Sequence, residues 1–297
     1  MSDSLLSIIV TTYSRPQLLP RAVASALEQT VADFEVVVVD DGSTEPVTLP
    51  GRPRLRVMRL PVNRGLSAAR NIAAKMAHGR WISYLDDDDQ LLPHFAEVSL
   101  NALSHTTLPK PVAVLSGLEA VTTDGVLIQT HLPPTLPRGS YFGLENIDPQ
   151  LSFFSKQTLV VEREVLLGIG GFDESFSALP YTEMFLRLNP VCSLVGVPVV
   201  TYRQFIHQGP RLSSDPSRRQ GDFHRLISKH APLFRARPQV LAHFALRHAH
   251  SLYNLGQHRA AFVSLCGTLQ SHPFSTLVGL TSVLWRKLRW HRGFSLF

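Results

Sequence analysis

The first 90 residues alternate short, β-branched apolar runs with helical patterns, and this alternation sets the strongest limit on the fold. Four runs bounded by polar residues have the character of strands buried on both faces of a sheet, and they span 7–12, 34–40, 55–60 and 81–85. Apolar residues recur at helical spacing over 18–27, and an alanine-rich helix is expected at 67–77. Strands that alternate with helices in this way predict an α/β fold with a doubly wound, mostly parallel central sheet.

The middle of the chain has a mixed pattern of helix and strand signals. A helix is predicted at 93–103, and short strand signals at 112–115 and 126–128 are joined by a Thr-Asp-Gly turn. Two further strand candidates lie at 159–161 and 195–201. We therefore expect this part of the chain to extend the sheet with α+β elements.

From about residue 215 the sequence becomes rich in helix formers, with frequent histidine and arginine. Residues 245–262 resemble one helical hairpin of the tetratricopeptide kind, with Gly256 at its turn. We therefore predict an α/β domain at 1–214, with halves at 1–110 and 111–214, and an all-helical C-terminal extension at 215–297.

Composition excludes several classes of protein. With 44% hydrophobic residues, the 297-residue chain can bury a full core. Cys192 and Cys266 stand apart, so we expect neither a disulfide framework nor a zinc site, and a cytoplasmic location fits best. The sequence opens without a basic n-region, and no apolar stretch approaches the ~20 residues that span a bilayer. We therefore expect neither a signal peptide nor a membrane span.

The net charge of +6 is unevenly distributed, which helps to identify partners. Basic residues gather between 211 and 292, whereas acidic clusters lie in the first third, so a uniform nucleic-acid-binding stripe is not indicated and no nucleic-acid partner is expected. Leucines at 277, 280, 284 and 288 form an apolar stripe flanked by basic residues. Two interpretations stay open: a helix lying peripherally on an anionic membrane, at its inner face, or a terminal helix docked on the protein.

The strongest chemical signal is a run of four carboxylates directly after a predicted strand. Tyr84-Leu85 leads into Asp86, Asp87, Asp88 and Asp89, and like charges this close repel unless a cation compensates them. Because alternate strand residues point to the same side, Asp86 and Asp88 could share one site for Mn²⁺ or Mg²⁺, which prefer oxygen ligands. The alternative is a solvated loop with a helix N-cap at Asp88 or Asp89.

Two other polar segments follow predicted strands, at the edge where doubly wound sheets bind ligands. Asp40-Asp41-Gly42-Ser43 closes the second strand; a carboxylate there can accept hydrogen bonds from a base or a ribose, although the tetrapeptide also suits an ordinary turn. Residues 63–71 (Asn-Arg-Gly-Leu-Ser-Ala-Ala-Arg-Asn) place Arg64 just before a helix and Arg70 one turn inside it, where phosphate is favoured, with a capped surface helix as the alternative.

Taken in order, four motifs resemble those of family 2 glycosyltransferases. They are Ser-Ile-Ile-Val-Thr-Thr-Tyr-Ser-Arg-Pro from residue 7, Asp-Asp-Gly-Ser from 40, Asn-Arg-Gly-Leu-Ser-Ala-Ala-Arg-Asn from 63, and Tyr-Leu-Asp-Asp-Asp-Asp from 84. The resemblance covers about residues 5–210. It implies a GT-A fold and an inverting transferase that takes a sugar from a nucleoside diphosphate donor, expected to be UDP-linked. By the same resemblance, 1–110 is the nucleotide-sugar-binding half and 111–214 the acceptor half.

The resemblance also implies roles for individual residues. Thr11, Tyr13, Arg15 and Asp40 would contact the nucleoside, with Asp41 beside it. Asp86 and Asp88 would form the metal-binding D-x-D motif, and Asp87 between them would belong to the donor-binding residues. His207 would ligate the metal or touch the diphosphate, against the alternative of a solvated or structural histidine. Arg64 and Arg70 are expected to favour the phosphates.

One departure from the family pattern concerns the general base that an inverting transfer requires. The Gly-Gly-Phe-Asp-Glu segment from 170 and the helix around Arg187 match the family, but the acidic pair expected at the start of that helix falls on Pro180 and Tyr181. We predict Glu183 as the base, with Asp173 as a substitute. A site without a base is the alternative.

Three functions therefore follow from the sequence. The first is transfer of a sugar to a saccharide or lipid-linked acceptor in cell-surface polysaccharide synthesis. The second is a catalytically degenerate relative that binds nucleotide sugars or acts as a scaffold. The third, a nucleotidyltransferase, is disfavoured because residues 12–17 (Thr-Tyr-Ser-Arg-Pro-Gln) are not a glycine-rich phosphate loop.

Overall fold

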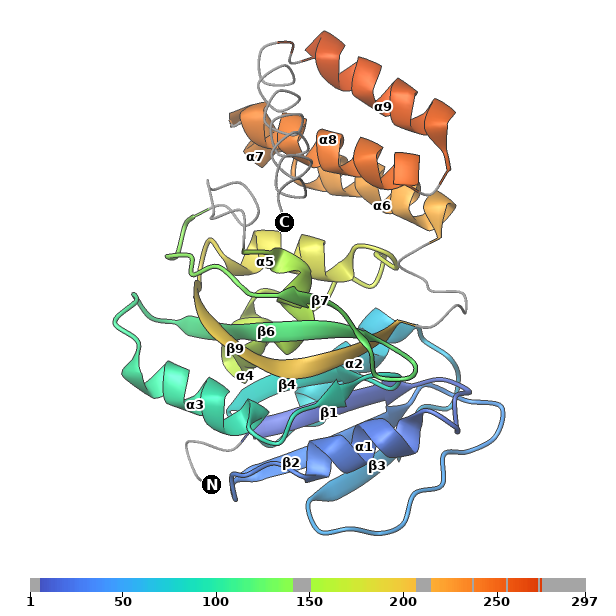
Figure 1. Cartoon of the computed structure of the whole chain (residues 1–297), viewed down its shortest axis with the longest axis vertical. Helices are drawn as coiled ribbons and strands as arrows, with labels where there is room; N and C mark the ends of the chain where they lie inside the picture. The colour runs from blue at the N-terminus through green and yellow to red at the C-terminus, as the bar shows by residue number, and fades with distance from the viewer. Residues whose placement is uncertain are drawn as a thin grey trace, which may run out of the picture. The chain divides into compact units, whose positions relative to one another are not determined.

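The structure is a computed structural model that describes residues 6–140, 151–206, 215–236, 238–254, 256–271 and 273. These residues group into two compact units, one formed by Met1–Phe176 with Pro180–Gly209 and the other by Ser177–Leu179 with Pro210–Phe297. The first unit contains β1 (Leu6–Thr12), α1 (Leu19–Leu27), β2 (Phe34–Asp40), β3 (Leu55–Arg59), α2 (Leu66–Met76), β4 (Trp81–Asp86), β5 (Gln90–Leu91), α3 (Phe95–His105), β6 (Val112–Thr122), β7 (Leu127–His131), a 3-10 helix (Phe153–Thr158), β8 (Val160–Glu162), α4 (Arg163–Gly168), α5 (Pro180–Leu188) and β9 (Ser193–Ile206) (Figure 1).

The strands form one sheet in the order β3-β2-β1-β4-β8-β6-β9-β5, with β7 paired to β6. The first four strands are parallel, as the alternation of strands and helices predicts. Beyond β4 the sheet is mixed: β8 is antiparallel to both β4 and β6, whereas β9 runs parallel to β6. The α/β fold class is thus confirmed, and the parallel part coincides with the N-terminal third.

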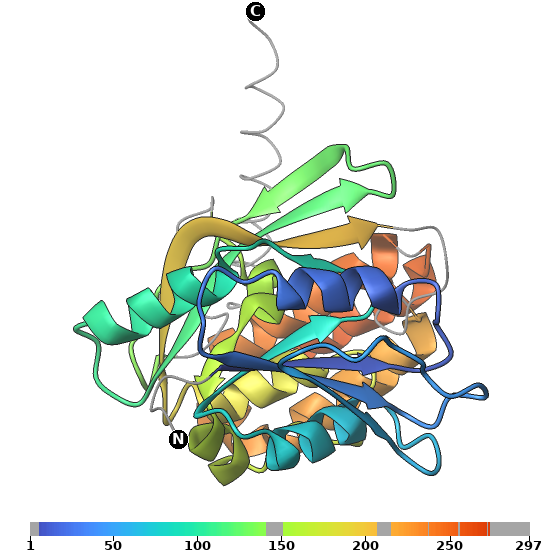
Figure 2. The same ribbon diagram turned by 90° about the horizontal axis from the view of Figure 1, so that it is seen from below.

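Side-chain alternation along the parallel strands divides the core into two layers. Ile9, Val37 and Val39 point into one cluster, which α2, α4 and α5 also enter. Ile8 and Val10, one residue out of step, point into the other cluster together with α1 and α3. Figure 2 shows α1 and α2 on opposite faces of these strands. The strands are therefore buried on both sides, and only their ends are free to carry polar chemistry.

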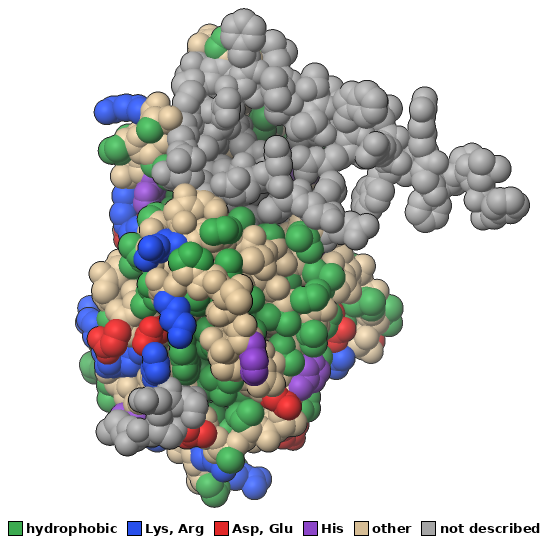
Figure 3. All heavy atoms as spheres, turned by 90° about the vertical axis from the view of Figure 1, so that its left-hand side faces the viewer, with side chains coloured by type: hydrophobic (Ala, Val, Ile, Leu, Met, Phe, Trp, Pro, Cys, Tyr) green, Lys and Arg blue, Asp and Glu red, His purple; other side chains and the backbone are tan. Residues whose placement is uncertain are grey.

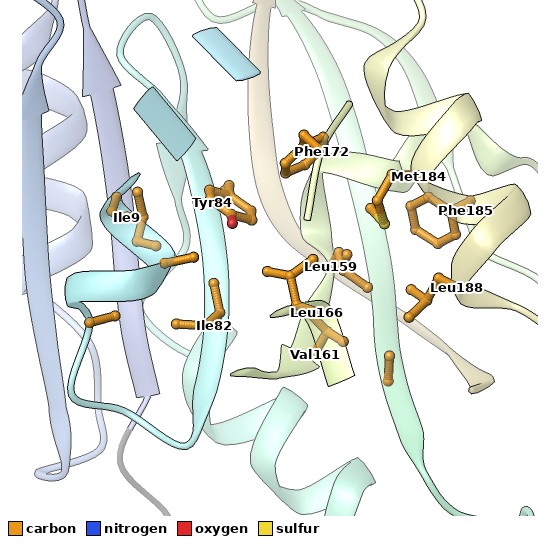
Figure 4. Close-up of a cluster of buried hydrophobic side chains, with 14 of the residues drawn as sticks. Ile9, Ile82, Tyr84, Leu159, Val161, Leu166, Phe172, Met184, Phe185 and Leu188 are labelled. Atoms are coloured by element: carbon orange, nitrogen blue, oxygen red, sulfur yellow. The ribbon is translucent and has the colours of Figure 1, made fainter. Parts of the chain in front are cut away.

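The first of these clusters connects the sheet to the helix that carries the predicted base. Tyr84 of β4 packs edge-on against Phe172, with ring centroids 5.3 Å apart, and Met184 and Phe185 of α5 are fully buried in the same cluster. Figure 4 shows these side chains between β4 and α5. The apolar core thus connects α5 with the N-terminal strands of the sheet.

Besides the non-helical segment Ser177–Leu179, the second unit contains α6 (Pro216–Lys229), α7 (Ala231–Ala236), α8 (Pro238–Asn254) and α9 (His258–Ser271). Asp215 caps α6, because its carboxylate accepts hydrogen bonds from the backbone N–H groups of Ser217 and Arg218. The predicted hairpin is present as α8 and α9, with Gly256 between them at a φ of +76°. The predicted helix around residues 277–292 lies outside the described residues.

The described surface carries charges of both signs (Figure 3). On the face in Figure 3, basic and acidic side chains are interspersed with apolar ones, without a continuous basic stripe in the part described. Among the residues that the structure describes, no helix is both long and apolar enough to cross a membrane.

Candidate active site

The candidate site lies at the carboxyl ends of three neighbouring strands. The register of β1 with β2 pairs Thr12 with Asp40, and the register of β1 with β4 pairs Thr11 with Asp86. Three motifs that are far apart in the sequence therefore meet at one edge of the sheet, as expected for ligand sites of doubly wound folds.

Each of the four consecutive carboxylates at this edge has a polar partner. Asp86, at the end of β4, forms an ion pair with Arg70 of α2. Asp87 accepts hydrogen bonds from Thr12 Oγ1 at 2.6 Å and from Arg15 Nη1 at 3.0 Å. The same guanidinium nitrogen lies 3.2 Å from Asp88 Oδ2.

The fourth carboxylate, Asp89, is turned away from the edge and into the sheet. Its Oδ2 accepts from the Tyr202 hydroxyl at 2.9 Å, and its Oδ1 accepts from the backbone N–H of Phe205 at 3.0 Å. Tyr202 also accepts a long hydrogen bond from the Asp86 N–H. Asp89 thus ties β9 to the acidic run, a contact that links residues more than a hundred positions apart.

Electrostatics around the run reflect its crowding. Burial raises the pKa of Asp87 to about 6, although Thr12 and Arg15 partly offset the effect. Burial, together with the charges of Asp86 and Asp88, also raises the pKa of Asp89 well above its usual range. The run has four carboxylates and contacts two arginine side chains, so a further cation would relieve the repulsion between the carboxylates.

The donor set of the cluster suits a hard divalent ion. One carboxylate oxygen from each of Asp86, Asp88 and Asp89 lies within 4.8 Å of the others. Because both Asp89 oxygens already accept hydrogen bonds, Asp86 and Asp88 are the better candidates for ligands, as the sequence predicts. Carboxylate oxygens are the ligands that Mg²⁺ and Mn²⁺ prefer. The predicted acidic cluster is present, and metal binding by Asp86 and Asp88, like the identity of the ion, stays a prediction.

The Asp-Asp-Gly-Ser segment shapes the loops around the edge. Asp40 is fully buried and accepts from the Ser43 N–H at 2.8 Å and the Val47 N–H at 3.2 Å. Burial works to raise the pKa of Asp40, but hydrogen bonds from Ser43 and Val47 and the charge of Arg59 outweigh it and lower the pKa. Asp40 therefore stays ionised at neutral pH.

Asp41 secures the next loop in a similar way. Its two oxygens accept from the backbone N–H groups of Arg64 at 2.8 Å and Gly65 at 2.9 Å, immediately before α2. Both oxygens are used, so in this arrangement Asp41 shapes the loop that carries Arg64. The Arg64 side chain is exposed.

The predicted nucleoside contacts on the first loop differ in exposure. Thr11 is buried, Tyr13 is 48% exposed, and the Arg15 side chain is 40% exposed while it bridges Asp87 and Asp88. An exposed aromatic ring beside a carboxylate-lined edge can stack on a planar base. The structure thus places Tyr13 and Arg15 at the surface of the site and Thr11 beneath it.

Arg70 is buried rather than open to a ligand. Its side chain is 2% exposed, and its guanidinium carbon lies 4.9–5.6 Å from the ring centroids of Tyr84, Phe172 and Tyr181. Its Nε and Nη1 atoms have no hydrogen-bond partner. Arg70 therefore acts on this edge through its ion pair with Asp86, which is itself 30% exposed.

The two predicted bases have contrasting surroundings. Glu183 is fully buried, and its two oxygens accept hydrogen bonds from Nε and Nη2 of Arg187. Arg187 also donates to the carbonyls of Ile169 and Gly171. This pair holds the turn before Phe172 and leaves Glu183 without an exposed oxygen. Asp173 is partly exposed and accepts from the N–H and hydroxyl of Ser175.

The remaining predictions and some unpredicted contacts complete the site. His207 lies outside the described residues, so its role stays a prediction. Two contacts were not predicted from the sequence. Tyr202 donates a hydrogen bond to Asp89. The Asn71 side chain bonds both the N–H and the carbonyl of Phe172, each at 2.8 Å. Asn71 lies in a motif used for the resemblance, whereas no local pattern marks Tyr202.

Comparison with known proteins assigns the chain to a family. Residues 7–158 match the family described as Glycosyl transferase family 2. The chain belongs to this glycosyltransferase family. An uncharacterized glycosyltransferase of Haemophilus influenzae is 26% identical over 221 residues, which cover 73% of this chain and 74% of that protein. The family predicted from the four motifs is therefore confirmed.

Other family 2 relatives have more specific names. A chondroitin synthase of Escherichia coli is 36% identical over 209 residues, covering 68% of this chain and 29% of the synthase, so the chain spans less than a third of that relative. The Escherichia coli protein WfgD is named as a UDP-Glc:alpha-D-GlcNAc-diphosphoundecaprenol beta-1,3-glucosyltransferase. It is 31% identical over 107 residues, or 35% of this chain and 42% of WfgD.

A solved structure confirms the fold. The crystal structure of S. aureus TarS residues 1–349 in complex with UDP-GlcNAc superposes with a TM-score of 0.56 at 20% identity, covering 83% of this chain and 69% of that one. The chain thus has the GT-A fold followed by C-terminal helices.

Proposed function

We propose that this family 2 glycosyltransferase transfers a sugar with inversion from a nucleoside diphosphate donor, UDP in the first instance, to a saccharide or lipid-linked acceptor in cell-surface polysaccharide synthesis. The observation that carries the proposal is the meeting of Asp40, the Tyr13–Arg15 loop and the acidic run at one sheet edge. The names of the relatives support the donor and acceptor classes, because they include a UDP-Glc-dependent enzyme acting on a diphosphoundecaprenol and a UDP-GlcNAc complex.

Each residue of this edge has a proposed task. Tyr13 would stack on the base, and Asp40, whose two oxygens accept from the Ser43 and Val47 N–H groups, would hold the loop that borders the nucleoside. Asp86 and Asp88 would hold Mn²⁺ or Mg²⁺. When bound, the ion would supply positive charge to the departing diphosphate. Arg15, which lies against Asp88 and has a side chain 40% exposed, would bind the same phosphates, and Arg64 is a second exposed candidate.

The reaction needs a general base that takes the proton from the hydroxyl group of the sugar acceptor. The acceptor hydroxyl oxygen attacks the anomeric carbon from the face opposite the diphosphate, so a new C–O bond forms as the bond to the leaving phosphate oxygen breaks, and the hydroxyl proton passes to the base. We propose Asp173 for this role over Glu183, because Glu183 is enclosed by its pair with Arg187, while Asp173 is partly exposed.

A degenerate relative that binds donors without turnover is the second candidate function. It is favoured by the Tyr181 side chain at the start of α5, whose ring packs against Phe172 with centroids 5.2 Å apart where the family pattern has a carboxylate. Burial raises the pKa of the Tyr181 hydroxyl far above its usual range, so it would not accept a proton at neutral pH.

One experiment separates the two candidates. UDP release from a panel of UDP-sugars would be measured with Mn²⁺, Mg²⁺ or EDTA, with lipid-linked and saccharide acceptors, for the wild type and for Asp88→Ala, Asp173→Asn and the neighbouring control Glu174→Gln. We expect metal-dependent release that is lost in Asp88→Ala and falls at least ~100-fold in Asp173→Asn, with little change in the control. Metal-dependent UDP binding without turnover would instead support the degenerate relative.

The cytoplasmic location and a peripheral membrane contact through residues 277–292 belong to the same proposal. Co-sedimentation of the full chain with anionic and neutral vesicles would test the contact. Binding to anionic vesicles that truncation after residue 273 abolishes is the expected result, and binding that survives truncation would rule out this segment.

A further inference from the structure

A buried carboxylate in the C-terminal helical unit binds three consecutive backbone N–H groups. Asp222 of α6 is 2% exposed, and its Oδ2 accepts from the N–H groups of Ser177 at 2.8 Å, Ala178 at 2.6 Å and Leu179 at 3.0 Å. Its other oxygen accepts from Arg225 Nη1 at 2.9 Å, one turn later on the same helix. Successive N–H groups that converge on one anion form a strong, geometrically specific site, and here the protein supplies the anion itself.

The contact with Asp222 matters because Ser177–Leu179 directly precedes α5. Ser177–Leu179 belongs to the same compact unit as α6, but the chain continues from Leu179 directly into Pro180, the first residue of α5. Tyr181 and Glu183 lie in the first turn of that helix. Proline has no N–H and the preceding residue is Leu179, whose side chain cannot cap a helix, so the local sequence offers little to fix the entry to α5.

We propose that Asp222 is a positioning residue by which the C-terminal helical region fixes the entry to α5, and thereby the first turn of the helix on the acceptor half. The proposal rests on the proposed transfer function only where it concerns turnover. The anchor itself is a property of the folded chain. The helical region would then contribute to the transferase, because the segment it holds continues along the chain into Phe176 and Pro180 of the other unit.

Asp215 provides a matched control on the same helix. It also accepts backbone hydrogen bonds, but from Ser217 and Arg218 of its own helix, so Asp215→Ala weakens α6 without touching 177–179. Asp222→Asn is the conservative variant, because an amide oxygen can still accept from the N–H groups but carries no charge.

Hydrogen exchange of the full chain, measured on peptides that cover 177–188, tests the anchor without requiring activity. We expect Asp222→Ala to exchange at least ~10-fold faster in these peptides, a factor that corresponds to ~1.4 kcal/mol, with Asp222→Asn intermediate and Asp215→Ala unchanged. If Asp222→Ala does not fold, the comparison of Asp222→Asn with wild type decides. Unchanged exchange in Asp222→Asn and Asp222→Ala, or equal acceleration in Asp215→Ala, would overturn the proposal.

The effect of the anchor on function is tested with the same variants. UDP affinity in the presence of Mn²⁺ is the first readout, and turnover of UDP-sugar is the second. We expect UDP affinity to stay within ~2-fold while kcat for transfer falls at least ~10-fold in Asp222→Ala and recovers partly in Asp222→Asn. A parallel loss of UDP affinity would show general damage and overturn the positioning role. If the wild type transfers no sugar, the proposed function fails, while the exchange data still decide whether the anchor exists.

Discussion

Substitution of Gly42 offers a sharp test of how the site loops are built. The residue has a φ of +72°, and a Cβ added there would lie 2.5 Å from the carbonyl carbon of Val62 and 2.6 Å from the nitrogen of Asn63. Both neighbours are backbone atoms of the loop that Asp41 holds, so neither can swing away as a side chain would.

The structure allows the size of the effect to be divided into two parts. A left-handed φ costs an alanine ~1–2 kcal/mol. Overlap with rigid neighbours adds ~1–3 kcal/mol, so we expect Gly42→Ala to lower the free energy of unfolding by ~2–5 kcal/mol in total. Gly65→Ala has backbone strain without overlap, because its φ of +87° and ψ of 155° cost an alanine ~1–3 kcal/mol but no heavy atom lies within 4 Å of the added Cβ. Gly51→Ala has neither problem and should change stability by no more than ~0.5 kcal/mol.

Urea denaturation followed by circular dichroism and by tryptophan fluorescence would rank the three variants. The expected order of stability is Gly51→Ala, then Gly65→Ala, then Gly42→Ala, with UDP affinity weakened most in the last. If Gly42→Ala proves no less stable than Gly65→Ala, the close approach of the two loops has no energetic consequence, and the reasoning fails.

Three further predictions concern residues away from this turn. Glu183→Gln should lower the free energy of unfolding by ~2–4 kcal/mol, because it removes the charge that balances a largely buried Arg187. Thermal denaturation measures this change, and unchanged stability would make Glu183 a candidate for the general base again. Asn71→Ala should cost ~2–3 kcal/mol in urea denaturation, since it leaves the N–H and carbonyl of Phe172 unpaired, and a neutral result would contradict the bridging role. Burial, with the charges of Arg219 and His224, lowers the pKa of His248 to about 4. As the pH falls, His248 is therefore protonated first in the unfolded chain, near the ordinary histidine pKa of about 6.5. The free energy of unfolding of the helical unit should then decrease by up to ~3 kcal/mol between pH 6.5 and pH 4. Circular dichroism melts at pH 7.5 and 5 would show this, and His248→Phe, which keeps a ring against Phe223, should abolish the dependence.

Local patterns were sufficient to predict the parallel part of the fold. Each of β1, β2, β3 and β4 is a short run whose character does not depend on distant residues, and the right-handed connections between parallel strands leave few arrangements. The motifs after these strands could be placed at one edge for the same reason. The hairpin around Gly256 was predictable because its turn residue and helical spacing are also local.

What could not be predicted depends on contacts between distant segments. β8 has only three residues, and its antiparallel insertion between β4 and β6 leaves no local trace. The burial of Arg70 follows from rings contributed by β4, the Phe172 loop and α5, so its motif alone suggested an open phosphate ligand. Likewise, Glu183 matched an acidic position, but its enclosure by Arg187 is visible only once α5 packs against the turn at Ile169 and Gly171.

The arginines beside the acidic run affect whether the protein can fold before a metal ion binds. Arg15 and Arg70 contact three of the four carboxylates, and Tyr202 with the Phe205 N–H contacts the fourth. With these internal partners, the chain does not depend on a metal to bring its carboxylates together, in contrast to small domains that are unfolded without their ion. We therefore expect the protein to fold as a stable apoprotein and to keep its fold when a chelator is added.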